Sequence, residues 1–244
     1  MSWKETFVFA AAAVCLATPI RAQGTIQSVR FYRVKPDRVA DFNAATKQFA
    51  ETVKKAGSER YYSVWHSLSG NNEYVRVDLY NKYADLDQGP DPKTKEQATT
   101  LSGLAVHIGE CTESNRRTLS EVLPELSIPL TGELPKMIRV IQTEVKSDKI
   151  NEYVALIKSE VVPAQKKLGQ KFYSVSRISY GGTGFTSVAG IDKWADLDGG
   201  TAIQKASGPE AYQRFLTKLA GLMVHQEINV YALVPDSSYM RQMK

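Results

Sequence analysis

Histidines are the residues of this sequence best suited to proton transfer or ligand binding, because imidazole titrates near neutral pH. There are three, and two of them, His107 and His225, close the same pattern, Leu-x-Gly-Leu-x-Val-His. Either could serve as a ligand or as an acid or base. A pair kept in two equivalent places is also what a structural role predicts, and we favour that role. No Cys/His cluster has metal-ligand spacing, so no metal site is predicted.

A second group of candidates is polar and aromatic and lies in two short stretches, 65–66 and 74–78. A related stretch later in the chain carries Ser176, Arg177, Ser187 and Ala189 at four of the equivalent positions. A site built in one copy of a duplicated segment is free to decay in the other, so these asymmetric positions are candidates for binding a small ligand. The candidate ligand-binding residues are Trp65, His66, Tyr74, Arg76 and Asp78.

Both groups lie in a sequence whose two halves repeat each other. Residues 81–89 return as residues 192–200, 111 positions later, and the block that ends at His107 returns 118 positions later at His225. Solenoid repeats are about 20–50 residues long, so this period indicates two copies of a whole small domain. Within the repeated stretch, Asp85 and Asp196 lack the further oxygen ligands of a calcium loop, and we expect such carboxylates to accept hydrogen bonds from turn amides.

Hydrophobic periodicity predicts the same order of elements in both halves. Helices are expected at about 37–57, 94–108, 148–168 and 210–225, the third with a bend at Pro163. Strands are expected at 26–34, 61–68, 74–80 and 118–123, and again at 137–145, 172–180, 185–191 and 228–234. Each half is therefore β-α-β-β-α-β, which is the ferredoxin-like order.

With this element order, the tandem copies and the strand exits at 80–85 and 191–196, the sequence resembles the dimeric α/β-barrel superfamily, which includes antibiotic-biosynthesis monooxygenase-like and NIPSNAP-like proteins. The resemblance covers about residues 25–236. It implies an α+β fold in which two tandem ferredoxin-like βαββαβ repeats form one intramolecular pseudo-dimeric α/β barrel. In haem-handling relatives a helix histidine looks like the iron ligand, which would place haem at His107 or His225.

In such a barrel, the strand face that bears Tyr74, Arg76 and Asp78 would be either the interior or solvent. In the interior Arg76 and Asp78 must pair, because a lone buried charge is costly. The pair would then belong to a polar pocket with aromatic walls, as in many small-ligand sites. The alternative is an exposed patch or a purely structural ion pair.

Residues 1–22 have the charged start, apolar run and small-residue exit of a secretory leader, so we expect export to the periplasm or secretion and no membrane association after cleavage. The expected organisation is a first repeat at 23–123, a linker at 124–136, a second repeat at 137–236 and a C-terminal tail at 237–244. Cleavage leaves Cys111 as the single cysteine, which excludes an internal disulfide. A net charge of +5 without a basic stripe argues against nucleic acid as a partner.

Three functions stay open on the sequence. The first is an exported protein that binds a small, partly apolar molecule in or between the two halves, without a cofactor. The second is a monooxygenase of the antibiotic-biosynthesis type, cofactor-free or haem-dependent, as the resemblance would allow. The third is a structural or partner-binding module. Because the two halves can pair within one chain, a monomer or weak homo-oligomer is expected.

Overall fold

The computed structural model describes residues 26–87 and 92–240. The predicted leader and residues 241–244 of the predicted tail lie outside the described residues. The described strands are β1 (Ile26–Val34), β2 (Tyr62–Ser67), β3 (Glu73–Tyr80), β4 (Thr112–Val122), β5 (Met137–Val145), β6 (Tyr173–Tyr180), β7 (Phe185–Ile191) and β8 (Met223–Leu233). The α-helices are α1 (Val39–Lys55), α2 (Lys95–Glu110), α3 (Ile150–Leu156), α4 (Val162–Lys167), α5 (Ala202–Ser207) and α6 (Pro209–Leu222).

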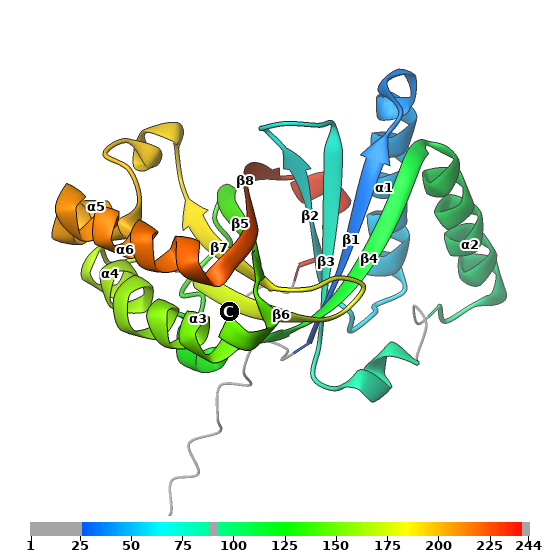
Figure 1. Ribbon diagram of the computed structural model, residues 1–244. Helices are drawn as coiled ribbons and strands as arrows, with labels where there is room; N and C mark the ends of the chain where they lie inside the picture. The colour runs from blue at the N-terminus through cyan, green and yellow to red at the C-terminus, as the bar shows by residue number, and fades with distance from the viewer. Residues whose placement is uncertain (1–25, 88–91, 241–244) are drawn as a thin grey trace, which may run out of the picture.

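The described strands form a closed antiparallel barrel in the order β1-β3-β2-β8-β5-β7-β6-β4. Each half contributes four neighbouring strands in the same relative order, β4-β1-β3-β2 and β8-β5-β7-β6. The halves meet edge to edge at β2–β8 and β4–β6. Helices α1 and α2 cover one outer side of the barrel and α3–α6 cover the opposite side (Figure 1). Closure therefore pairs every sheet edge in the described part of the chain.

Alternation along the strands sorts the side chains into an inner and an outer layer. The barrel interior is filled by a cluster of buried residues consisting of Phe31, Trp65, Val75, Ile138 and Tyr231. The outer face of each half-sheet packs against its own helices in a separate and larger cluster. The fully buried thiol of Cys111 belongs to the first-half cluster, where it packs as a small apolar group. Among the described residues, no helix combines the length and apolar composition needed to cross a membrane.

The segment that follows each half crosses onto the other half. After η3 (Pro124–Leu126), Ile128 forms a bridge with Tyr173 of β6, and the fully buried Leu126 joins the second-half cluster. After η7 (Pro235–Ser237), Tyr239 forms the equivalent bridge with Tyr62 of β2. Part of the expected linker thus completes the second half, and the described part of the expected tail completes the first.

The repeated stretch forms the same turn twice. In η2 (Tyr83–Leu86) an Asp85 carboxylate oxygen accepts two backbone amides at 3.2 Å. In η6 (Trp194–Leu197) Asp196 does the same at 2.8 and 3.0 Å. These bonds lower the pKa of Asp196, because they favour its charged form. The predicted capping role is confirmed for both carboxylates.

Both fourth strands begin earlier than the sequence predicted. β5 pairs with β8 back to Met223, so His225 lies in a strand opposite Glu144 and not at the end of a helix. The predicted helix 210–225 was wrong at its end because the second half has fewer residues between the shared pattern and the strand. The strand must start sooner to pair along the whole of β5, and the ladder overrides the helical periodicity.

Pro163 does not break its helix. The helical stretch from Ile150 to Lys167 runs on through a π-helical turn at Ile157–Val161, immediately before the proline. Proline lacks the amide that would bond the preceding turn, and a wider turn accommodates that loss without ending the helix. The sequence correctly predicted a helix irregularity near Pro163, but the irregularity is a π-helical turn and not a break in the helix.

We predict that Leu126→Ala lowers the free energy of unfolding by about 3 kcal/mol, because it leaves a cavity in the second-half core. Urea denaturation followed by circular dichroism measures this. The control is Leu68→Ala at a side chain that is 41% exposed, where the change should stay within about 0.5 kcal/mol. Equal losses in the two variants would contradict the packing role of the crossing segment.

Candidate functional site

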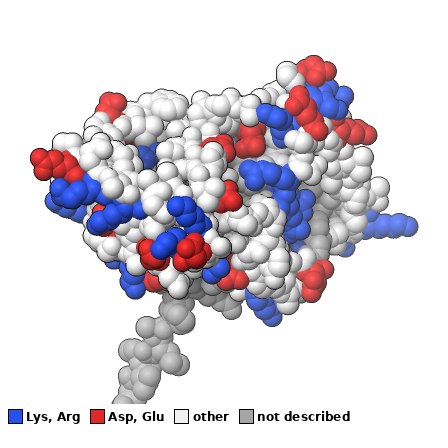
Figure 2. Space-filling view, viewed as in Figure 1, with Lys and Arg blue, Asp and Glu red and all other residues white. Residues whose placement is uncertain are grey.

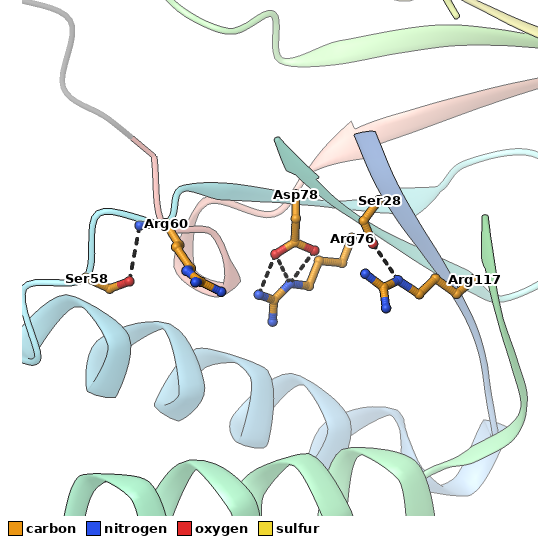
Figure 3. A network of polar contacts seen from close by, with 6 residues as sticks. All are labelled: Ser28, Ser58, Arg60, Arg76, Asp78 and Arg117. Atoms are coloured by element: carbon orange, nitrogen blue, oxygen red, sulfur yellow. Dashed lines mark hydrogen bonds and ion pairs between the residues drawn. The ribbon is translucent and has the colours of Figure 1, made fainter. Parts of the chain in front are cut away.

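A bidentate ion pair lies on the outer face of the first half-sheet, beneath α1 (Figure 3). Arg76 Nη2 donates to Asp78 Oδ1 at 2.7 Å, and Arg76 Nε is 3.1 Å from both carboxylate oxygens. The two side chains are 23% and 11% exposed. Burial alone would lower the pKa of Arg76, but the charge of Asp78 and the bonds to it raise that pKa above its ordinary value.

Aromatic rings hold the Arg76 guanidinium from the other side. Its carbon lies 3.7 Å from the centre of the Tyr62 ring and 5.1 Å from that of Phe49, within the range of cation–π attraction. The Tyr62 hydroxyl is buried, and no hydrogen-bond partner reaches it among the described residues. Burial raises the pKa of Tyr62 to about 12; the charge of Arg76 lowers it, and that of Asp78 raises it.

The space around this group is small. A cavity of about 20 Å³ lies between the half-sheet and α1. It is lined by Tyr32, Phe42, Thr46, Phe49, Tyr62, Val64, Arg76, Ile108 and Ser237. A volume of this size holds about one water molecule. This cavity therefore has polar groups and aromatic walls, but no room for an organic ligand.

The five predicted ligand-binding residues are not brought together. Trp65 points into the filled barrel interior, where its indole N–H donates to Ser63 Oγ at 2.8 Å. His66 and Tyr74 lie on the outer face with ring centres 4.4 Å apart, and His66 Nε2 is 3.0 Å from Asn72 Oδ1. Of the five, only Arg76 lines the small cavity.

The predicted position of the Arg76–Asp78 face needs correction. It lies neither in the barrel interior nor in solvent, because α1 covers it and Val75 and Val77 take the interior positions of β3. The pairing of Arg76 with Asp78, which was expected for a position in the barrel interior, occurs between sheet and helix, because that layer penalises a lone charge in the same way.

A row of arginines that crosses three strands was not predicted from the sequence. In the ladders Arg30 is paired with Arg76 on one side and with Arg117 on the other, so the three side chains share the outer face. Arg117 Nε donates to Ser28 Oγ at 2.7 Å (Figure 3). Figure 2 shows basic side chains gathered over β1 and β4. Only the strand order places these residues together, so no linear motif signals them.

The repeated histidines do not converge on a common site. His107 lies in α2, partly exposed and 3.5 Å from Glu110, while His225 lies in β8. Neither lines the cavity above or the groove below. Within the described ranges, no cluster of three or more His, Cys, Asp or Glu could hold a metal ion. The geometry gives these histidines no shared ligand to bind.

The second half contains a much larger space, a groove of about 630 Å³. Its floor includes Arg139 of β5 and Ala189 of β7, on the outer face of the half-sheet. The expected linker forms one wall, from Leu130 to Lys136. The opposite wall comes from the end of α4, the loop before β6 and the start of α5, with Gln165, Leu168, Phe172 and Ala202 among its residues.

Arg139 is the unusual residue of this groove. It is half-buried, its Nε is fully enclosed, and no hydrogen-bond partner reaches that atom in the described part of the chain. No described carboxylate forms an ion pair with it. Burial lowers the pKa of Arg139, and only the nearby Tyr173 and Tyr212 oppose this effect. The residue 111 positions earlier is Ser28, so this exchange of serine for arginine between the repeats is the signal in the sequence that could have found Arg139.

Comparison with known proteins identifies the fold. No protein-family model matches this sequence, and no curated protein matches it. A protein of Lactobacillus acidophilus NCFM, provisionally described as a monooxygenase, is 9% identical with a TM-score of 0.60, over 88% of this chain and 95% of its own. An anthrone oxidase-like protein is 16% identical with a TM-score of 0.56, over 86% and 91%. A provisionally described chlorite dismutase is 9% identical with a TM-score of 0.52, over 88% and 96%.

These neighbours are dimeric α+β barrels of the ferredoxin-like type, and the chain has that fold. At such low identities the likeness shows the fold alone, because one fold can carry many unrelated activities. The function has to be argued from the residues of this chain.

We predict that Asp78→Ala lowers the free energy of unfolding by about 3 kcal/mol, because it leaves the guanidinium buried without its counter-charge. The double variant Arg76→Met/Asp78→Ala should lose clearly less, which chemical denaturation of the full cycle measures. Glu113→Ala at an exposed pair is the control and should cost less than about 0.5 kcal/mol. Additive losses in the cycle would show that the pair is not coupled.

Proposed function

We propose that this protein binds a small, partly apolar molecule in the groove of its second half. The observation that supports this best is the contrast between the halves. The first has a cavity of about 20 Å³, and the second a groove of about 630 Å³ on the equivalent side of its sheet. Ligand pockets commonly measure about 300–1,000 Å³.

The composition of the groove agrees with such a ligand. Its apolar surface comes from residues such as Leu134, Leu168 and Phe172. Polar residues also line the groove, with Arg139 at the floor and the buried Gln165 in the wall. Apolar walls supply affinity, while a few fixed polar groups orient the ligand.

We further propose that the chain is a tandem duplication that forms, within one polypeptide, a barrel otherwise made by two subunits. The 111-residue shift, the matching strand orders and the two reciprocal crossing segments support this. A monomer or weak homo-oligomer then follows from the paired edges. The narrower likeness to NIPSNAP-like proteins rests on the sequence pattern alone, as does export through the leader at 1–22.

The filled barrel interior favours the structural or partner-binding alternative, since we expected a ligand site to open there. The groove lies outside that interior, so the filled barrel does not count against binding. The haem alternative has weaker support, because neither His107 nor His225 lines the groove.

We predict that the neutral fluorophore N-phenyl-1-naphthylamine binds the mature chain and gains fluorescence. Ala202→Trp should weaken its binding at least about tenfold, because the indole would fill part of the groove. Ala105→Trp, at an exposed position of α2, is the matched control and should leave binding unchanged. Absence of a saturable signal, or equal binding in both variants, would contradict the proposed site.

A second candidate is a cofactor-free monooxygenase. It is favoured by the descriptions of the Lactobacillus acidophilus protein and the anthrone oxidase-like protein, and by a guanidinium that could stabilise an anionic form of a substrate.

For this second candidate, we expect a phenolic substrate to raise oxygen uptake above the buffer rate, measured with an oxygen electrode, and Arg139→Met to abolish the increase. Ala105→Trp again serves as the control. Uptake that is no faster than in buffer would remove this candidate and leave the binding function standing.

A further inference from the structure

We infer that the molecule bound in the groove is a monoanionic acid with an apolar body, and that its carboxylate pairs with Arg139. This inference rests on the proposed binding function and names the class of its ligand. It follows from the charge at the floor of the groove, from a comparison of the two halves, and from the distribution of charge around the rim.

The charge at the floor has no internal partner. A buried or half-buried guanidinium without a counter-ion is costly, so such groups are normally paired. Arg139 has its Nε enclosed and unbonded, and no described carboxylate lies within ion-pair distance. The same residue lines the groove, where a ligand can reach it. A bidentate carboxylate matches the fork of a guanidinium and would provide the missing charge.

The first half shows how this chain otherwise treats such a group. There Arg76 is neutralised by Asp78, which lies directly opposite Ser28 in the ladder. In the second half the arginine occupies the position equivalent to Ser28, and the residue directly opposite it is Ala189, the counterpart of Asp78. The second half thus also has a guanidinium, that of Arg139, on the outer face of its sheet. Where the first half has the carboxylate of Asp78, the second has only the methyl group of Ala189, beside the groove. The ligand would occupy the place of that carboxylate.

A second polar side chain faces the same space. Gln165 of α4 is only 6% exposed and lines the groove. A carboxylate could accept from its side-chain amide as well as from Arg139, so the groove provides two donors beside the apolar surface of Leu134, Leu168 and Phe172.

The rim argues for a single negative charge and against phosphate-like dianions. Lysines at the rim are exposed, and Lys205 donates to the backbone oxygen of Asp196. Glu133, Asp192 and Asp196 also line the groove and would repel a multiply charged ligand. The lysines and carboxylates of the rim offset one another, which leaves the guanidinium at the floor to match one carboxylate.

The experiment compares 2-naphthoate with 2-naphthamide, which share a ring system and differ in charge. Isothermal titration calorimetry with the mature chain should show the acid binding at least about tenfold tighter, since charge-assisted bonds are stronger than neutral ones. Arg139→Met should reduce the preference to less than about twofold, while the amide still binds. Equal binding of acid and amide to the wild-type chain, or a preference that survives in Arg139→Met, would overturn the inference.

Ala189→Asp provides an independent test and covers the case in which Arg139→Met fails to fold. An aspartate directly opposite Arg139 is close enough to pair with it, so it should abolish the preference for the acid. Asparagine has nearly the same size as aspartate but no charge, so Ala189→Asn should retain the preference for the acid over the amide. If the aspartate variant folds and retains the preference, the inference is wrong.

The neutral fluorophore separates the two proposals. If N-phenyl-1-naphthylamine binds and naphthoate does not displace it, the groove is a binding site but its ligand is not an acid. If neither the fluorophore nor either naphthalene compound binds, the proposed function itself fails.

Discussion

The pairing of sheet edges is the constraint on which the rest of the structure depends. A four-stranded half-sheet covered by helices on one face leaves its other face and both edge strands unsatisfied. Joining β2 to β8 and β4 to β6 solves both problems, since it closes the barrel and encloses Phe31, Trp65 and Tyr231. The small cavity and the groove both lie outside this inner layer, on the outer faces of the two half-sheets.

The two half-sheets have the same strand order, but the layers between each of them and its helices are filled differently. In the first, Arg76, Asp78 and Tyr62 form a compact polar and aromatic group that fills the space beneath α1. In the second, small residues such as Ala189 and Gly190 lie beside the expected linker and leave a groove with a single guanidinium. From the sequence, we expected the first half to be the copy that had kept a site. The structure shows that the more open space belongs to the second.

Much of the architecture was predictable because its signals are local or periodic. Alternation located β3, and the repeated stretch that contains Asp85 and Asp196 correctly indicated two equivalent turns. The end of α6 was not predictable, because pairing with β5 decides it from across the sheet. The candidate site was predicted only in part. Arg76 and Asp78 do pair, but which face of β3 meets the helices depends on closure, and the isolation of Arg139 depends on residues from four separate segments.

The crossing segments make each half incomplete without the other. Leu126 and Ile128 are encoded beside the first half but finish the core of the second, and Ser237 and Tyr239 do the reverse. A break in the backbone after Ile128 would therefore produce two fragments that each carry a piece of the other's interior. Neither fragment should fold well alone, but the two should fold when they are mixed. The part of the linker between the crossing segment and β5 can therefore vary in length more freely than the short stretches on either side of it.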